Sequence, residues 1–346
     1  MTRLFAPCLG VLLLAGSLSA GELPFWGFAV DGYPVTGQRV QELEGETGLP
    51  AQMVVFFLQW PSLRREASAS FPEESLDAVW SSGALPCLTW EPMYYEGEKE
   101  IVIPFAAILG GSYDRFLEDF ADRAARWKKP LIIRFAHEMN LSRYAWGTGG
   151  AGYGPDSPEI YRRIFRHVVS IFRRRGADNV LWAFCPNAES VPGVSHDPSA
   201  AWNRAEDYYP GGAWIDILGM DGYNWGRSRT LERHGWESRW SSFRETFAPL
   251  YEKLRALAPE KPVVVFETAS VAAGGDRSLW LHEALGVARQ WNLAGIAWFQ
   301  ADTDNRWRIT RQEVPPAEGL LGPERCAAQA WASSLLPAGF FEKKKH

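Results

Sequence analysis

Eight apolar runs recur along the chain, and each is nearly continuous rather than alternating. The last positions of each run, in contrast, hold acids, amides or tryptophans. Near-continuous apolar strands are typical of a parallel sheet that is covered on both faces. The pattern therefore predicts eight buried parallel strands. They occupy residues 25–32, 51–60, 83–92, 130–140, 179–187, 215–224, 262–270 and 294–302.

Segments with helical periodicity separate these runs. In residues 157–176 the apolar side chains recur on one face and the arginines on the other, with Pro158 near the start and Gly176 at the end. Eight alternating strand–helix units predict an α/β fold, a (β/α)8 TIM barrel in a single domain. A doubly wound open sheet is the rival fold, but no glycine-rich phosphate loop follows the first run. Helices are expected within residues 112–129, 157–176, 240–259 and 277–292, and long loops within 93–111 and 141–156.

Carboxylates gather at the ends of the predicted strands. In a (β/α)8 barrel the carboxyl ends of the strands form the face that carries the active site. His137 is the one histidine at these ends, and no serine or cysteine occupies a nucleophile elbow. Because no spacing typical of a metal site occurs, we expect carboxylate chemistry with no metal and no other cofactor. The carboxylates are Asp31, Glu91, Glu138, Asp221, Glu267 and Asp302.

Glu138 and Glu267 form the leading pair of carboxylates. They end the fourth and seventh predicted strands, which places them across the barrel mouth from each other. Glycoside hydrolysis needs one carboxyl group that holds a proton and a second that stays ionised. A separation of about 5 to 5.5 Å between them is typical of a retaining enzyme. We interpret Glu91 as a structural or sugar-binding group rather than as a third catalyst.

The fourth run continues into RFAHEMN, which resembles the acid/base motif of glycoside hydrolase family 26. Shorter similarities to the family lie in LTWEP, AFCPN, DILGMDGYN, VVFETAS and GIAWFQAD, and in RWRI after the last run. The family contains β-mannanases, with some β-glucanases and β-1,3-xylanases. The resemblance implies an endo-β-glycosidase that cleaves β-1,4-mannan by double displacement, with Glu138 as general acid/base, Glu267 as nucleophile and Tyr223 as the partner of Glu267. The matching motif residues are Arg134, His137, Glu138, Asn140, Tyr144, Trp146 and Gly147.

Two positions depart from the family pattern. Leu141 stands where the family has glycine, and Arg143 stands where it has a tryptophan that lines the cleft. A guanidinium in the cleft suits an acidic or substituted sugar, whereas an outward-turned Arg143 would pair with a surface acid. Arg134 and Asn140 are expected to support the site. The candidate substrate contacts are His137, Tyr223, Asn187, Trp146, Trp298, Arg143 and Trp90.

Composition adds two constraints. The chain has 17 Trp, 11 Tyr and 19 Phe, an excess that suits either a large core or stacking of aromatic rings on sugars. The formal net charge of -5 does not favour nucleic acid as a partner.

Residues 1–20 have the pattern of a secretory signal peptide, with Arg3, an apolar stretch and then small residues. The apolar stretch is shorter than a membrane span requires. We therefore expect a mature catalytic domain of residues 21–346 that is secreted or periplasmic, monomeric, free of the membrane after cleavage, and directed at a polysaccharide. Three alternatives stay open: a periplasmic glycosidase that processes a different exopolysaccharide, acidic or not, a β-glucanase or β-1,3-xylanase, and a sugar-binding protein without turnover.

Overall fold

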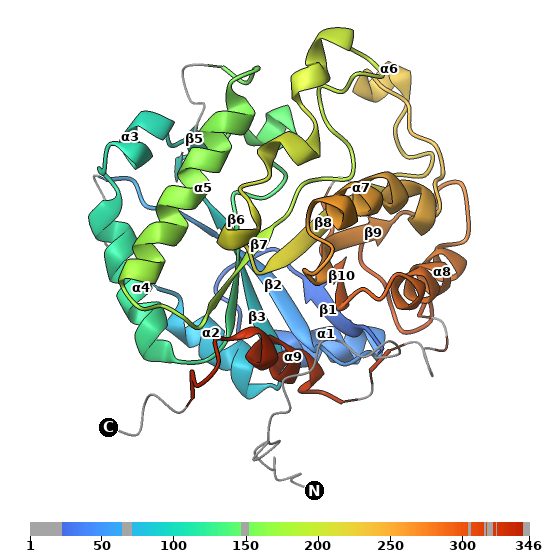
Figure 1. Ribbon diagram of the computed structural model, residues 1–346. Helices are drawn as coiled ribbons and strands as arrows, with labels where there is room; N and C mark the ends of the chain where they lie inside the picture. Colours follow the sequence, from blue (N-terminus) through green and yellow to red (C-terminus); the bar gives the residue numbers. More distant parts are fainter. Residues whose placement is uncertain are drawn as a thin grey trace, which may run out of the picture.

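The computed structural model describes residues 23–63, 71–146, 152–303, 306–314, 316, 321–322 and 324–341. Eight parallel strands close into a barrel in the order β1-β10-β9-β8-β7-β6-β3-β2 (Figure 1). The predicted (β/α)8 barrel is thereby confirmed. The barrel strands are β1 (Phe25–Ala29), β2 (Met53–Gln59), β3 (Leu85–Glu91), β6 (Leu131–Phe135), β7 (Val180–Phe184), β8 (Ile217–Asn224), β9 (Val263–Ser270) and β10 (Gly295–Phe299).

Helices cover the outside of this barrel. Figure 1 shows α4 beside α5 on one flank and α7 beside α8 on another, and these two pairs are in contact. No helix among the described residues is long and apolar enough to cross a membrane. The α-helices are α1 (Gly37–Thr47), α2 (Glu73–Ser81), α3 (Phe105–Leu109), α4 (Asp114–Trp127), α5 (Ser157–Arg174), α6 (Leu231–His234), α7 (Phe243–Leu257), α8 (Arg277–Gln290) and α9 (Ala327–Leu335). The short 3-10 helices are η2 (Ser142–Tyr144), η3 (Pro198–Trp202), η4 (Ala205–Tyr208) and η5 (Gly212–Trp214).

Side chains alternate between the barrel interior and the helix layer along each strand, as strand geometry requires. On β6, Ile132 belongs to the interior cluster, whereas Ile133 and Phe135 belong to the core beneath the helices. The same alternation on β3 puts Cys87 inside and Trp90 outside. Alternation therefore decides which strand-end residues reach the barrel mouth.

The long loop after β3 contains regular structure that the sequence did not predict. An antiparallel hairpin of β4 (Met93–Glu96) and β5 (Lys99–Val102) lies there, followed by α3. The hairpin comes directly after the end of β3 and so stands at the barrel face where the strands end.

Candidate active site

The chain bends sharply where β6 ends. Ala136 and Glu138 both adopt positive φ angles, 48° and 50°, which residues with a side chain rarely do. Backbone hydrogen bonds hold the bend, from the Ala136 N–H to the Trp90 carbonyl (3.0 Å) and from the Glu138 N–H to the Cys185 carbonyl (2.8 Å). Such local strain is common at functional sites. Here it accompanies the turn that carries Glu138 into the pocket at the barrel mouth.

Glu138 is buried and receives a hydrogen bond from a neutral amide. The Asn187 side chain donates to Glu138 Oε1 at 2.6 Å. Asn140 fixes Asn187 in turn, because it accepts from the Asn187 N–H (2.8 Å) and donates to the Asn187 carbonyl (2.9 Å). Burial, reinforced by the charge of Glu267, raises the pKa of Glu138 to about 7. At neutral pH this carboxyl group is therefore protonated in a substantial fraction of molecules.

Glu267 reaches the same pocket through an irregularity in the sheet. The pairing of β8 with β9 shifts between Met220, opposite Val265, and Asp221, opposite Glu267. The shift leaves one extra residue on β9, so Glu267 does not follow Val265 toward the helix layer. Tyr223 donates its hydroxyl to Glu267 Oε2 at 2.6 Å.

Arg134 lies buried among the strands that carry these groups. Its guanidinium forms ion pairs with both Asp221 and Glu267. It also donates to the Thr89 hydroxyl from Nε (3.0 Å) and from Nη2 (2.6 Å). A buried cation is stable only when it is paired and hydrogen-bonded. Arg134 thus orients one oxygen of Glu267, while Tyr223 orients the other.

A pocket of about 470 Å³ joins the two glutamates. Its walls combine the carboxyl groups of Glu138, Glu267 and Glu189 with seven aromatic side chains, and pockets of this size are typical of small-molecule sites. The residues that line it are Phe57, Glu138, Leu141, Arg143, Tyr144, Asn187, Ala188, Glu189, Val191, Gly222, Tyr223, Trp225, Trp236, Thr246, Glu267, Phe299, Thr303 and Trp307. Of the predicted site residues, the structure brings Glu138, Glu267, Tyr223, Asn187 and Arg143 together here.

Trp90 and Trp298 do not line this pocket, which corrects their predicted contacts with substrate. Both side chains are fully buried in the helix-side core. Trp90 packs against Phe120 with ring centroids 4.4 Å apart, and the Trp298 indole N–H donates to the Trp307 carbonyl at 2.9 Å. Strand alternation explains the error, because each of them neighbours an inward-facing residue on its strand.

His137 and Trp146 do not line this pocket and lie behind Tyr144, so their contacts with substrate stay a prediction. His137 is 1% exposed and Trp146 is 4% exposed. The Tyr144 ring stacks on Trp146 at 5.1 Å and lies 4.7 Å from His137. Burial and the nearby charge of Arg134 hold the pKa of His137 well below its usual value, so the imidazole is neutral. The two residues support Tyr144, which lines the pocket.

The sequence left two interpretations of Arg143 open, a place in the cleft and a pair with a surface acid, and the structure shows both. It lines the pocket, and it forms a two-pronged ion pair with Glu100 of the β4–β5 hairpin, with both N–O distances at 2.6 Å. Its guanidinium also lies 5.0 Å from the centre of the Tyr144 ring. Because Glu100 balances its charge, Arg143 does not present a free cation to a ligand.

Glu91 is a third carboxyl group near the pair. The Gln59 side chain donates to it at 2.5 Å, and burial raises its pKa to about 7. It ends β3 and does not line the pocket. Among the described residues, no group of three or more His, Cys, Asp or Glu side chains is arranged to hold a metal ion.

Several pocket residues escaped the sequence analysis. In the sequence, Tyr144 is one residue of the family motif and Trp307 is part of RWRI, and neither is predicted to contact substrate. Trp225 directly follows the Tyr223–Asn224 pair, and this adjacency is a signal that could have found it. Phe299 follows Trp298 on β10, so strand alternation is a signal that could have found it. Trp236 carried no local signal, because the loop geometry that brings it to the pocket is not visible in the sequence.

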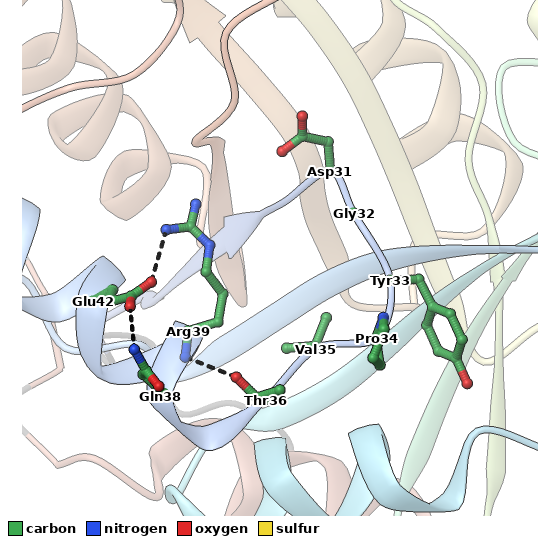
Figure 2. Close-up of a pocket in the computed structure, with 9 residues that line it drawn as sticks. All are labelled: Asp31, Gly32, Tyr33, Pro34, Val35, Thr36, Gln38, Arg39 and Glu42. Carbon is green, nitrogen blue, oxygen red and sulfur yellow. Dashed lines mark hydrogen bonds and ion pairs between the residues drawn. The ribbon is translucent and has the colours of Figure 1, made fainter.

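A second hollow, of about 420 Å³, lies at the start of α1 beside the exposed Asp31 (Figure 2). Arg39 pairs there with Glu42 (3.6 Å) and with Glu46 (3.4 Å). Figure 2 shows the Tyr33 ring pointing away from these charges. The arginine is thus neutralised within its own helix, and we assign no chemistry to this hollow.

Known proteins resemble the chain in sequence. A model of glycosyl hydrolase family 26 matches residues 110–236. Endoglucanase H of Acetivibrio thermocellus is 30% identical over 272 residues, which cover 78% of this chain and 27% of that protein. A mannan endo-1,4-beta-mannosidase of Bacillus subtilis is 27% identical over 170 residues, 43% of each chain. The chain therefore spans about a quarter of the length of the first relative and less than half of the second.

Solved structures resemble the chain in fold. The YdhT protein of Bacillus subtilis superposes with a TM-score of 0.58 at 19% identity, covering 83% of this chain and 82% of that one. The Bacillus subtilis mannanase BCman gives a TM-score of 0.58 at 18% identity, covering 89% and 85%. These likenesses agree with the observed barrel. The family-model match and the sequence relatives place the chain in glycoside hydrolase family 26.

Proposed function

We propose that this protein hydrolyses β-glycosidic bonds within a polysaccharide by double displacement, with retention of anomeric configuration. The observation that carries the proposal is the shared pocket of Glu138 and Glu267, in which the two carboxyl groups have different neighbours. One is buried beside a neutral amide, and the other faces a cation and a phenol. Two carboxyl groups with different environments are what a retaining glycosidase needs.

The roles follow from these environments. Glu138, whose pKa is raised to about 7, gives its proton to the departing glycosidic oxygen. Glu267, oriented through both of its oxygens, attacks the anomeric carbon and forms a glycosyl-enzyme. Glu138, now ionised, takes a proton from water, and the resulting hydroxide displaces Glu267 from the sugar. Both glutamates are present and positioned, which favours turnover over sugar binding alone.

We propose β-1,4-mannan as the first substrate class, because relatives named mannan endo-1,4-beta-mannosidase match this chain. A β-glucan is the second candidate, since the relative that covers most of this chain is named an endoglucanase. An acidic polymer is the weaker alternative, because Glu100 already balances the charge of Arg143. Export to the periplasm or medium and a monomeric state remain part of the proposal; the expected signal peptide lies outside the described residues.

A hydrolysis panel tests the proposal. Purified protein is incubated with β-1,4-mannan, mixed-linkage β-glucan, β-1,3-xylan and an acidic β-linked polymer, and new reducing ends are measured. Release of oligosaccharides from one of the neutral polymers is expected, with proton NMR showing β-anomers as the first products. Initial α-products contradict retention. The absence of new reducing ends from all four polymers contradicts the proposed hydrolase activity.

A further inference from the structure

Trp236 is set apart from the other tryptophans by its exposure. All 17 tryptophans of the sequence lie within the described residues, and Trp236 is the one that leaves more than a third of its surface exposed, at 44%. A single exposed apolar side chain needs no explanation, but an exposed ring that continues the aromatic lining of a pocket is typical of a binding surface. Trp236 lines the same pocket as the two glutamates.

A row of rings connects Trp236 with the proposed nucleophile. Tyr223, which donates to Glu267, lies 5.1 Å from Trp307 between ring centroids. Trp307 lies 4.9 Å from Trp225, and Trp225 lies 5.9 Å from Trp236. Trp225 also lies 6.1 Å from Tyr223, so one ring, that of Trp225, separates Tyr223 from Trp236. A ligand that reached both Glu267 and Trp236 would have to extend beyond a single sugar unit.

The loop that carries Trp236 is held in place before any ligand binds. The Ser238 hydroxyl accepts from the Arg229 N–H at 3.1 Å, and the Ser238 N–H donates to the Arg229 carbonyl at 3.2 Å. The Arg229 guanidinium covers the Trp225 ring at 4.4 Å. Ordering is a main cost of binding, so a ring that is already fixed contributes more to affinity.

We propose that Trp236, backed by Trp225, is a sugar-binding subsite for a pyranose unit of the same polymer, at least one unit away from the bond that is cleaved. The apolar C–H face of the sugar packs on the exposed indole ring. This inference rests on the proposed function, because it places the polymer in the pocket of Glu138 and Glu267. A subsite at this position explains why the aromatic rings continue from Tyr223 through Trp225 to Trp236.

Steady-state kinetics with Trp236→Ala test the subsite. On whichever polymer the wild type cleaves, we expect KM to rise roughly tenfold with a smaller change in kcat, which is the size of one lost aromatic contact. On an aryl β-glycoside too short to reach the subsite, the loss should be at least fivefold smaller. Trp236→Phe should restore most of the polymer affinity. Leu231→Ala is the matched control, because Leu231 is 69% exposed on the same loop and does not line the pocket.

Equal losses on polymer and aryl glycoside, or an equal effect of Leu231→Ala, overturn the subsite while leaving the hydrolase intact. Binding without turnover gives a second readout. In electrophoresis through gels that contain β-1,4-mannan or mixed-linkage β-glucan, Glu267→Ala should be retarded, and Glu267→Ala/Trp236→Ala should be retarded much less. This difference supports the subsite even if no polymer is cleaved. Equal mobility of the two variants in both gels overturns it.

Discussion

The ends of β6 and β9 both bring a glutamate into one pocket, but by different backbone means. After β6, Ala136 and Glu138 take positive φ angles, and the chain turns through a strained bend. In β9 the strand continues to Ser270, and an extra residue in the pairing with β8 turns Glu267 inward. Bends and bulges are two general ways to redirect a side chain without changing the fold.

The two glutamates also differ in their neighbours. Glu138 is held by the neutral amide of Asn187, and burial raises its pKa. Glu267 is held by the Arg134 cation and the Tyr223 hydroxyl, and both donors favour negative charge on it. In the proposed mechanism the same side chain therefore serves as an acid at one strand end and as a nucleophile at the other, because of what surrounds it.

Removing the nucleophile tests this division most severely. Glu267→Ala should lower kcat on polymer by roughly 10⁴-fold or more, because no glycosyl-enzyme can form. Added azide should restore part of the activity and give a glycosyl azide of inverted configuration, identified by NMR. Azide with Glu138→Ala should instead give a product of retained configuration. The same configuration from both variants would mean that the two roles are not divided in this way.

Removing the acid should have a smaller effect that depends on the substrate. Glu138→Gln is expected to lower kcat/KM on polymer by about 10² to 10⁴-fold, the usual contribution of general acid catalysis. An aryl glycoside with a good leaving group needs little protonation of the departing oxygen. The rate of its first step, measured as release of the phenol, should therefore fall far less than the rate on polymer. Comparable losses on both substrates argue against Glu138 as the acid.

The Tyr223 hydroxyl should contribute less than either glutamate. Tyr223→Phe removes its 2.6 Å hydrogen bond to Glu267. A hydrogen bond to a charged group is worth about 1.5 to 3 kcal/mol, so kcat/KM should fall about 10- to 100-fold. Tyr251→Phe is the control, since Tyr251 donates to the Trp291 carbonyl in the helix layer. An equal kinetic loss in both variants would point to a general structural effect.

The pH profile gives the smallest effect. Because Glu138 acts when protonated and its pKa is raised to about 7, kcat/KM should fall as the pH rises above about 7. The charge of Glu91 contributes to this raised pKa. Glu91→Gln should therefore move the falling limb to lower pH, by less than about one unit. If the falling limb of kcat/KM stays at the same pH in Glu91→Gln, Glu91 does not contribute to the raised pKa of Glu138.

Strand periodicity determined how much of the site the sequence could predict. The apolar runs located all eight strands, and their polar ends pointed to the face where Glu138 and Glu267 lie. Alternation along β3 and β10 was available too, and it would have placed Trp90 and Trp298 on the helix side. The bulge that reorients Glu267 was not predictable, because the pairing shift depends on β8 as well as β9.

Loop geometry limited the prediction in a different way. Arg143 lies in the β6–α5 loop and Glu100 in the β4–β5 hairpin, and nothing local in either segment indicates that they meet. Trp236 reaches the pocket only because its loop folds back over Trp225. Contacts of this kind depend on tertiary structure between distant segments, so periodicity and motif spacing do not reveal them.

The contacts of Arg134 have a consequence for how the chain folds. Its partners come from β3, β8 and β9, and the two carboxylates follow it in the sequence by 87 and 133 residues. A folding intermediate that had buried β6 before β9 docked would enclose a cation with half of its counter-charge missing, which is unfavourable. We therefore expect docking of β8 and β9, which supply both carboxylates, to be coupled to burial of Arg134.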